Sequence, residues 1–191
     1  MSRYQKLFNQ LTKDPAYLGN LDWGKPRRGH PEGTVRAHIE ELEGNLSRLP
    51  VEKGSEEYWK LKILIHVHDS FKKDSKKGVP IDHPHSHASL ARRFLERYCR
   101  EPDLLNMVQY HDEPYALYRQ YAQRGRANPQ RLSKLLAGIG DWELFCKFLL
   151  VDNCTEGKDS APTEWNIQHL AGPRGLEGAM REWLERLQRA A

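Results

Sequence analysis

Apolar residues recur at helical spacing along most of the chain, in blocks that Pro and Gly residues separate. The segment 86–100 is a clear example, because Ala91, Phe94 and Leu95 fall on one face, and Ser86 is suited to cap its N-terminus. No segment alternates with period two for long, so the pattern predicts an all-α fold with almost no sheet. The blocks predict helices over residues 3–12, 34–49, 56–72, 86–100, 102–110, 115–124, 129–139, 141–154 and 176–189.

The composition is that of a polar but folded protein. A chain of 191 residues can form one domain with a real hydrophobic core, and its 38% of hydrophobic residues balance 29% of charged ones. The net charge of +4 suits a small anionic substrate and is too weak to predict binding to a nucleic-acid polymer. Three cysteines without a CxxC pair predict reduced thiols in a cytoplasmic protein. No apolar run resembles a signal peptide or a membrane span, so we expect no membrane partner.

The histidines carry the clearest chemical signal. The sequence has nine of them, and the pair His68-Asp69 stands at the end of an apolar helix, in ILIHVHDSFKK. Ionisable groups in such a place need partners, because burying them unpaired is costly. A metal ion is one suitable partner, since imidazole nitrogen and carboxylate oxygen bind iron, manganese and zinc.

In this order of residues, the chain resembles the HD-domain superfamily of metal-dependent phosphohydrolases. That family has a first His, an adjacent His-Asp pair, often two further His and a distant Asp. The resemblance covers roughly residues 31–160, and we expect a single HD-domain helical bundle. Residues 1–30 would form an N-terminal helix and loop, and residues 161–191 a C-terminal helical extension packed on the same domain. The matching segments are EGTVRAH with His38, HDSFK with His68 and Asp69, HASLARRFL with His87, YHDEP with His111, and FLLVDNCTEGKD with Asp152.

The resemblance implies a centre for two divalent metal ions, with Asp69 bridging them. Iron or manganese suits such a centre, and zinc, cobalt, nickel or magnesium are the other candidates. A metal-bound water or hydroxide would be the nucleophile. The ligands of one ion would be His38, His68, Asp69 and Asp152, and those of the second ion would be His87, His111 and Asp69.

Lys72 follows Asp69 by three residues, which matches the HDxxK pattern of several phosphate-handling members of the family. Its implied role is to neutralise phosphate charge in the transition state, so Asp69 and Lys72 are the expected catalytic residues. No dedicated general acid stands out, although Asp112 or a histidine of the 83–85 loop could serve. The residues expected to bind substrate are Lys72, Lys73, Asp112 and His83; a solvated surface position is the simpler interpretation of Lys73 and His83, and of the neighbouring Lys76 and Lys77.

Two ligand positions have rivals in the sequence. Asp141 competes with Asp152, but it follows a glycine and has the setting of a helix N-cap. His83 and His85 compete with His87, which we prefer because it begins a helix and precedes the alanine and leucine pattern of the family.

The chain also departs from some related patterns. His111 is followed by Asp112, where some dinuclear and trinuclear members carry a second His. Thr34 stands one turn before His38, where trinuclear members use Glu. Both departures argue against a trinuclear cyclic-di-GMP phosphodiesterase. His66 faces away from the expected ligands and is interpreted as a core or surface residue.

The leading interpretation is a phosphohydrolase that cleaves a phosphoester or phosphoanhydride of a nucleotide or a small phosphorylated metabolite. The six-ligand pattern is similar to that of bacterial HD hydrolases acting on symmetrical dinucleoside polyphosphates, an assignment by family analogy alone. One alternative is an HD-type diiron oxygenase acting on an inositol-like or phosphonate-like substrate, although Lys72 favours hydrolysis. Another is a non-catalytic metal-binding signalling module, which would be expected to lack ligands. The oligomeric state stays open.

Overall fold

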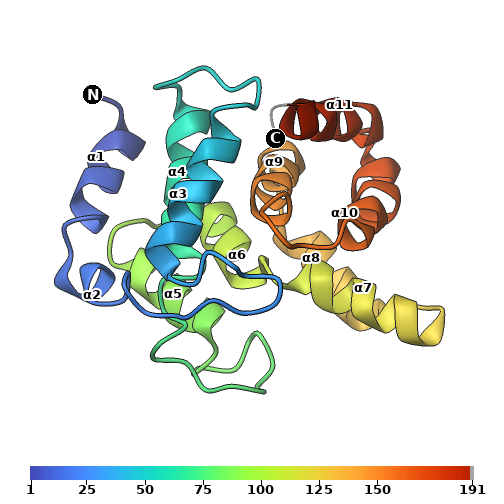
Figure 1. The fold of residues 1–191 in the computed structure, drawn as a ribbon, viewed down its shortest axis with the longest axis horizontal. Helices are drawn as coiled ribbons and strands as arrows, with labels where there is room; N and C mark the ends of the chain where they lie inside the picture. Colours follow the sequence, from blue (N-terminus) through green and yellow to red (C-terminus); the bar gives the residue numbers. More distant parts are fainter. Residues whose placement is uncertain (190–191) are drawn as a thin grey trace.

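The computed structural model describes residues 1–189 and confirms the all-α fold, since these residues form no strand and only two isolated β-bridges. Figure 1 shows how the helices are arranged. In chain order they are α1 (Arg3–Leu11), α2 (Pro15–Leu18), α3 (Val35–Leu46), α4 (Glu56–Val67), α5 (His87–Glu96), α6 (Pro102–Tyr110), α7 (Glu113–Arg124), α8 (Pro129–Gly138), α9 (Trp142–Asn153), α10 (Ala161–Asn166), a π-helical turn η1 (Ile167–Ala171), a 3₁₀ turn η2 (Gly172–Arg174) and α11 (Glu177–Arg189).

Helix α4 is the centre of the fold. It contacts α1, α3, α5, α6 and α9, and it lies beside α3 near the middle of Figure 1. Its second half is mostly apolar and buried, with Lys62 and His66 as its partly exposed positions, which is typical of a helix packed against several others. The helix α9 adds two large aromatic side chains to the same core. The fully buried residues of these two helices include Leu61, Ile63, Leu64, Ile65, Val67, Phe145 and Phe148.

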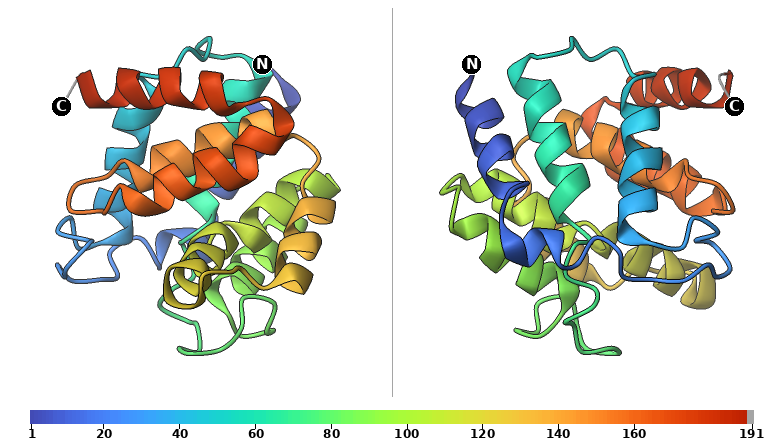
Figure 2. Two further views of the ribbon diagram at one scale, coloured as in Figure 1. Left: turned by 90° about the vertical axis from the view of Figure 1, so that its right-hand side faces the viewer. Right: turned by 60° about the vertical axis from the view of Figure 1, so that its left-hand side comes forward.

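Both ends of the chain pack on this core. Helix α1 lies against α4, and α11 lies against α9 and η1. The first view of Figure 2 shows α9, α10 and α11 stacked beside one another. The boundaries expected at residues 31 and 160 stay a prediction, and residues 190–191 of the expected C-terminal extension lie outside the described residues. The longest described helix, α11, has 13 residues, whereas a helix that crosses a bilayer needs about 20. No described helix is therefore long enough to cross a membrane.

Most helices lie where the apolar pattern predicts them, with two kinds of difference. The helix expected over residues 56–72 ends at Val67, because His68 and Ser70 make side-chain hydrogen bonds to carbonyl groups of the last helical turn. The short helices of residues 15–18 and 161–174 were not predicted. The π-helical turn within the second segment takes an extra residue, so its buried positions depart from the usual helical spacing.

Two long connections define one end of the molecule. Residues 19–34 join α2 to α3, residues 68–86 join α4 to α5, and both lie below α3 and α4 in Figure 1. Asn20 Nδ2 donates a hydrogen bond to Asp74 Oδ2 at 3.2 Å, which ties the two connections together. The candidate functional residues are at this end of the fold.

Candidate metal centre

The ends of five helices bring the six expected ligands to one place. Helix α6 stops before its ligand because Pro114 has no N–H to donate to the carbonyl group of Tyr110. Helix α5 starts at its ligand because the Ser86 hydroxyl, as predicted, caps the N-terminus by accepting from Ser89 N at 3.1 Å. The six residues are His38 in the first turns of α3, His68 and Asp69 after α4, His87 at the start of α5, His111 after α6 and Asp152 near the end of α9.

Three of these side chains form one group of possible ligands, and a fourth borders it. His38, His68 and Asp152 each offer an atom within 4.8 Å of the others. His38 Nε2 lies 3.1 Å from Asp152 Oδ1, and His68 Nε2 lies 3.8 Å from the same oxygen. Asp69 directs its Oδ2 atom toward this group, 3.5 Å from His68 Nε2 and 3.9 Å from His38 Nε2. The four side chains therefore converge on one point.

The second oxygen of Asp69 belongs to another group. Its Oδ1 atom lies 3.4 Å from His111 Nε2 and 3.6 Å from His87 Nε2. The two histidine Nε2 atoms are 3.1 Å apart. Asp69 thus presents one carboxylate oxygen to each group of histidines, which is the arrangement that a shared ligand needs.

The protonation pattern of the buried rings suits a metal ion. His68 Nδ1 donates to the carbonyl oxygens of Leu64 and Ile65, at 3.1 and 3.0 Å, and His111 Nδ1 donates to Val108 O at 2.8 Å. In a neutral ring this leaves the lone pair on Nε2, which is how proteins commonly fix a metal-binding histidine. His68 Nε2 is buried and has no hydrogen-bond partner among the described residues. Because an unsatisfied buried polar atom is costly, this donor set fits a cation.

Burial and charge set the pKa values in the centre. Burial lowers the pKa of His68 to about 4, against the attraction of the nearby carboxylates, so its ring is neutral at pH 7. Burial opposes ionisation of Asp69, but Lys72 and His68 hold the pKa of this carboxyl well below its usual value. Burial also disfavours a charge on His111, yet Asp112 and Asp69 raise its pKa to about 9. Without a metal ion, His111 is therefore protonated at pH 7.

A lysine accompanies each carboxylate ligand. Lys72 is paired with Asp69 Oδ2. Lys158 Nζ lies 2.9 Å from Asp152 Oδ1 and 2.6 Å from the carbonyl oxygen of the same residue. Burial works against the ionised form of Asp152, but Lys158 and His38 keep its pKa well below the usual value. Lys158 was not predicted, because it lies in an irregular turn after α9 where no periodic pattern marks it.

Glu32 and His30 also extend the centre in a way the sequence did not reveal. Glu32 Oε1 lies 3.1 Å from His38 Nδ1 and 3.0 Å from His30 Nδ1, and the three residues form a further group with metal-binding side chains. The contact between Glu32 and His38 meets the distance for an ion pair but not the geometry of a hydrogen bond, and a carboxylate so close behind a metal-binding histidine strengthens the ring as a ligand through its charge. The only sign of this contact in the sequence is that Glu32 and His30 lie shortly before His38, in the connection that leads into α3.

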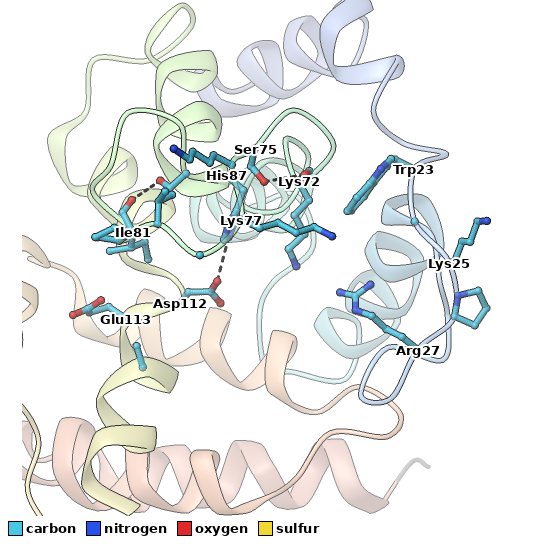
Figure 3. Close-up of a pocket in the computed structure, with 18 of the residues that line it drawn as sticks. Trp23, Lys25, Arg27, Lys72, Ser75, Lys77, Ile81, His87, Asp112 and Glu113 are labelled. Atoms are coloured by element: carbon cyan, nitrogen blue, oxygen red, sulfur yellow. Dashed lines mark hydrogen bonds and ion pairs between the residues drawn. The ribbon is translucent and has the colours of Figure 1, made fainter. Parts of the chain in front are cut away.

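Two cavities open beside the centre. One of about 1120 Å³ reaches His87 (Figure 3), and another of about 640 Å³ reaches Asp69, His111 and Asp152. Lys72 and Asp112 line both cavities. Asp112 Oδ2 lies 3.2 Å from His87 Nε2; half of this side chain is exposed, and although the protein around the carboxyl opposes its ionisation, His111 and His87 lower the pKa of Asp112.

Other candidate residues lie away from the centre. Lys73 and His83 line neither of the two large cavities; Lys73 is exposed, with Nζ 3.4 Å from Gly19 O. Asp141, the rival of Asp152, caps α9 instead, since its Oδ1 accepts from Leu144 N at 3.0 Å. His66 points to another face of α4, and its two ring nitrogens lie 2.6 Å from Tyr17 Oη and Glu43 Oε1.

The chain is thus an all-α protein with buried groups of histidine and aspartate that could hold metal ions, a combination compatible with an HD-type fold. No protein-family model, curated protein or solved structure matches it.

Proposed function

We propose that the protein is a metal-dependent phosphohydrolase of the HD type. The observation that carries this proposal is the position of Asp69, which offers one oxygen to His38 and His68 and the other to His87 and His111. His38, His68, Asp69 and Asp152 would hold one divalent ion, and Asp69, His87 and His111 the second. Iron or manganese suits this mixture of imidazole and carboxylate ligands.

Bound there, two ions would supply Lewis acidity toward a phosphoryl oxygen and a water of lowered pKa. The chain itself contributes positive charge. Burial disfavours the Lys72 ammonium, but Asp69 and Asp112 raise its pKa, so it is charged at neutral pH. Because Lys72 lines both cavities, its ammonium is placed to stabilise the charge that develops on a substrate phosphoryl group.

Asp112 is the other polar side chain common to both cavities. A carboxyl with a lowered pKa is ionised at pH 7, so it would accept a hydrogen bond from water and orient it rather than act as the general acid. In the reaction, a water oxygen forms a bond to phosphorus and the bond from phosphorus to the leaving oxygen breaks; the proton released from the water passes to bulk solvent, which also protonates the leaving oxygen.

The substrate of this proposed reaction is a phosphoester or phosphoanhydride of a nucleotide or of a small phosphorylated metabolite. Support comes from the larger cavity, whose wall contains six lysine and arginine residues against three acidic ones. The two cavities meet at Lys72 and Asp112, so a substrate with an arm on each side of the centre, such as a dinucleoside polyphosphate, would also fit.

The test is phosphate or nucleotide release from a broad panel of phosphorylated compounds. The protein is reconstituted without oxygen with Mn(II) or Fe(II), and His68→Ala is the control because it removes a buried ligand from one side of Asp69. Turnover by the wild type that is lost in the control is the expected result. A protein that holds metal, releases no phosphate and consumes oxygen with an inositol or phosphonate substrate would instead be an oxygenase. A wild type that binds no metal would be a non-catalytic module.

A further inference from the structure

The larger cavity has a wall that the metal centre does not use. It is formed by residues 22–27 of the connection before α3 and by residues 75–81 of the connection before α5. Figure 3 shows that Trp23, Arg27, Lys72 and Lys77 point into the same space. The cavity therefore combines one aromatic ring with three convergent cations.

The cations of this wall are free to bind an anion. Within residues 1–189, no carboxylate lies within ion-pair distance of Arg27 or Lys77. By contrast, the three acidic residues that line the cavity are already paired, Asp22 with Arg36, Glu113 with Arg131 and Asp112 with His87. A ligand with several negative charges would be attracted to this space, and a cationic one would be repelled.

The ring of Trp23 is held in place before any ligand arrives. Val35 N, at the start of α3, donates to Trp23 O at 3.0 Å. The next residue, Gly24, has φ +123°, and a Cβ atom there would lie 2.2 Å from Gly33 O. Only glycine allows the two segments of this connection, around Gly24 and Gly33, to approach so closely. The half-buried Trp23 ring packs against the core and keeps one side toward the cavity.

Lys72 connects this wall to the metal centre. It lines the same cavity as Trp23 and Arg27 and is also paired with the bridging Asp69. His87, one of the expected ligands, forms part of the cavity lining as well. A phosphate chain that starts at Arg27 and Lys77 would therefore reach the centre by way of Lys72.

We infer that this cavity is a nucleotide-binding site in which the base stacks on Trp23 while Arg27, Lys77 and Lys72 bind the phosphates. Stacking on an aromatic side chain suits any base, whereas the cations select for two or more phosphates. The inference rests on the proposed function in one respect, because it takes the metal centre as the place where the phosphate chain ends. It makes Trp23 and Arg27 determinants of specificity for nucleoside polyphosphates over other phosphorylated metabolites.

The test is isothermal titration of the manganese-reconstituted protein with two probes whose bridging oxygen is replaced by carbon. Methylene-bridged adenosine diphosphate carries the base, and methylenediphosphonate carries the phosphate mimic alone. Trp23→Ala is expected to weaken binding of the first probe roughly tenfold and to leave the second unchanged. Trp23→Phe keeps an aromatic ring and is expected to retain most of the affinity. Arg27→Met is expected to weaken both probes.

Lys73→Met is the matched control, since it removes one positive charge from the connection before α5 at an exposed side chain that lines neither cavity. Equal losses in Lys73→Met and Arg27→Met would overturn the inference, because they would show attraction by net charge alone. It would also be overturned if Trp23→Ala bound the adenosine probe like the wild type, or if a 5′-phosphorylated oligonucleotide bound as tightly as that probe.

The two proposals fail in different ways. If the probes bind as expected and no nucleotide is hydrolysed, the site stands and the phosphohydrolase proposal falls. If nucleotides are hydrolysed with a kcat/KM that Trp23→Ala does not change, the phosphohydrolase stands and the nucleotide site on Trp23 falls.

Discussion

Replacing Glu32 by glutamine tests whether the loop before α3 helps to hold a metal ion. Glu32 Oε1 lies 3.1 Å from His38 Nδ1, and the Nε2 atom of the same ring lies 3.1 Å from Asp152 Oδ1. The carboxylate therefore stands directly behind an expected ligand. Glutamine keeps the size of the side chain but removes the negative charge that makes the ring a stronger donor.

The size of the effect follows from this position. Loss of a carboxylate behind a metal-binding histidine typically weakens metal affinity 10- to 100-fold, or about 1–3 kcal/mol. Because glutamine can still accept a hydrogen bond, we expect Glu32→Gln to weaken binding of one ion by roughly tenfold and Glu32→Ala by roughly a hundredfold. The second ion, on the side of His87 and His111, should be affected less.

The assay is competition for Mn(II) or Zn(II) against a chromophoric chelator of known affinity. Glu40→Gln is the control, since it makes the same chemical change at an exposed position of α3 two residues after His38. An unchanged affinity in Glu32→Gln, or an equal loss in Glu40→Gln, would refute the assignment of Glu32 to the metal centre.

Three further predictions concern charged residues, two of them at the centre and the third against another face of α4. Lys72→Met should keep the bound metal and lower kcat roughly a hundredfold, because Lys72 stabilises charge in the transition state; metal analysis and phosphate release measure the two effects, and loss of metal would contradict the role. Metal binding at pH 7 should release a proton from His111, whose pKa is about 9 in the metal-free protein, so the heat of binding should depend on the buffer; buffer-independent heats would count against this. The pKa of Glu43 is lowered to about 2, mainly by His66 and also by Lys62, so its ionised form stabilises the fold above pH 4.5 and the gain disappears as the pH falls toward 2. With the carboxyl partly exposed, Glu43→Gln should cost about 1 kcal/mol in urea unfolding at pH 7 and less at pH 3, and an equal cost at both would refute the linkage.

The apolar pattern predicts the helical part of the fold well because the core requires it. Helix α4 needs many apolar residues since five other helices contact it, and an apolar run interrupted by Lys62 and His66 is visible in the sequence. The end of α4 could not be predicted, because it depends on hydrogen bonds from His68 and Ser70 to carbonyl groups of the same chain. The same hydrogen bonds hold the turn that directs Asp69 toward the metal centre.

The residues of the candidate site were likewise predicted only in part from the sequence. The six expected ligands meet in the structure, and their place at helix ends was readable from the sequence. Glu32 and Lys158 were missed because both lie in connections, where position in the chain says little about position in space. Lys72 and Lys73 are adjacent in the sequence, yet Lys72 is paired with Asp69 and Lys73 reaches toward the carbonyl of Gly19. The two side chains reach different partners only because the turn after α4 directs them to different sides.

The metal content of the wild type and of Asp69→Ala, measured after anoxic reconstitution and removal of free ions, tests the central claim most directly. Asp69 faces both groups of histidines, so the account predicts two ions per chain in the wild type and loss of at least one of them in Asp69→Ala. A matched variant, Asp141→Ala, alters only the N-cap of α9 and should keep both ions. A wild type without bound metal, or an Asp69→Ala variant that binds both ions as tightly as the wild type, would contradict the account.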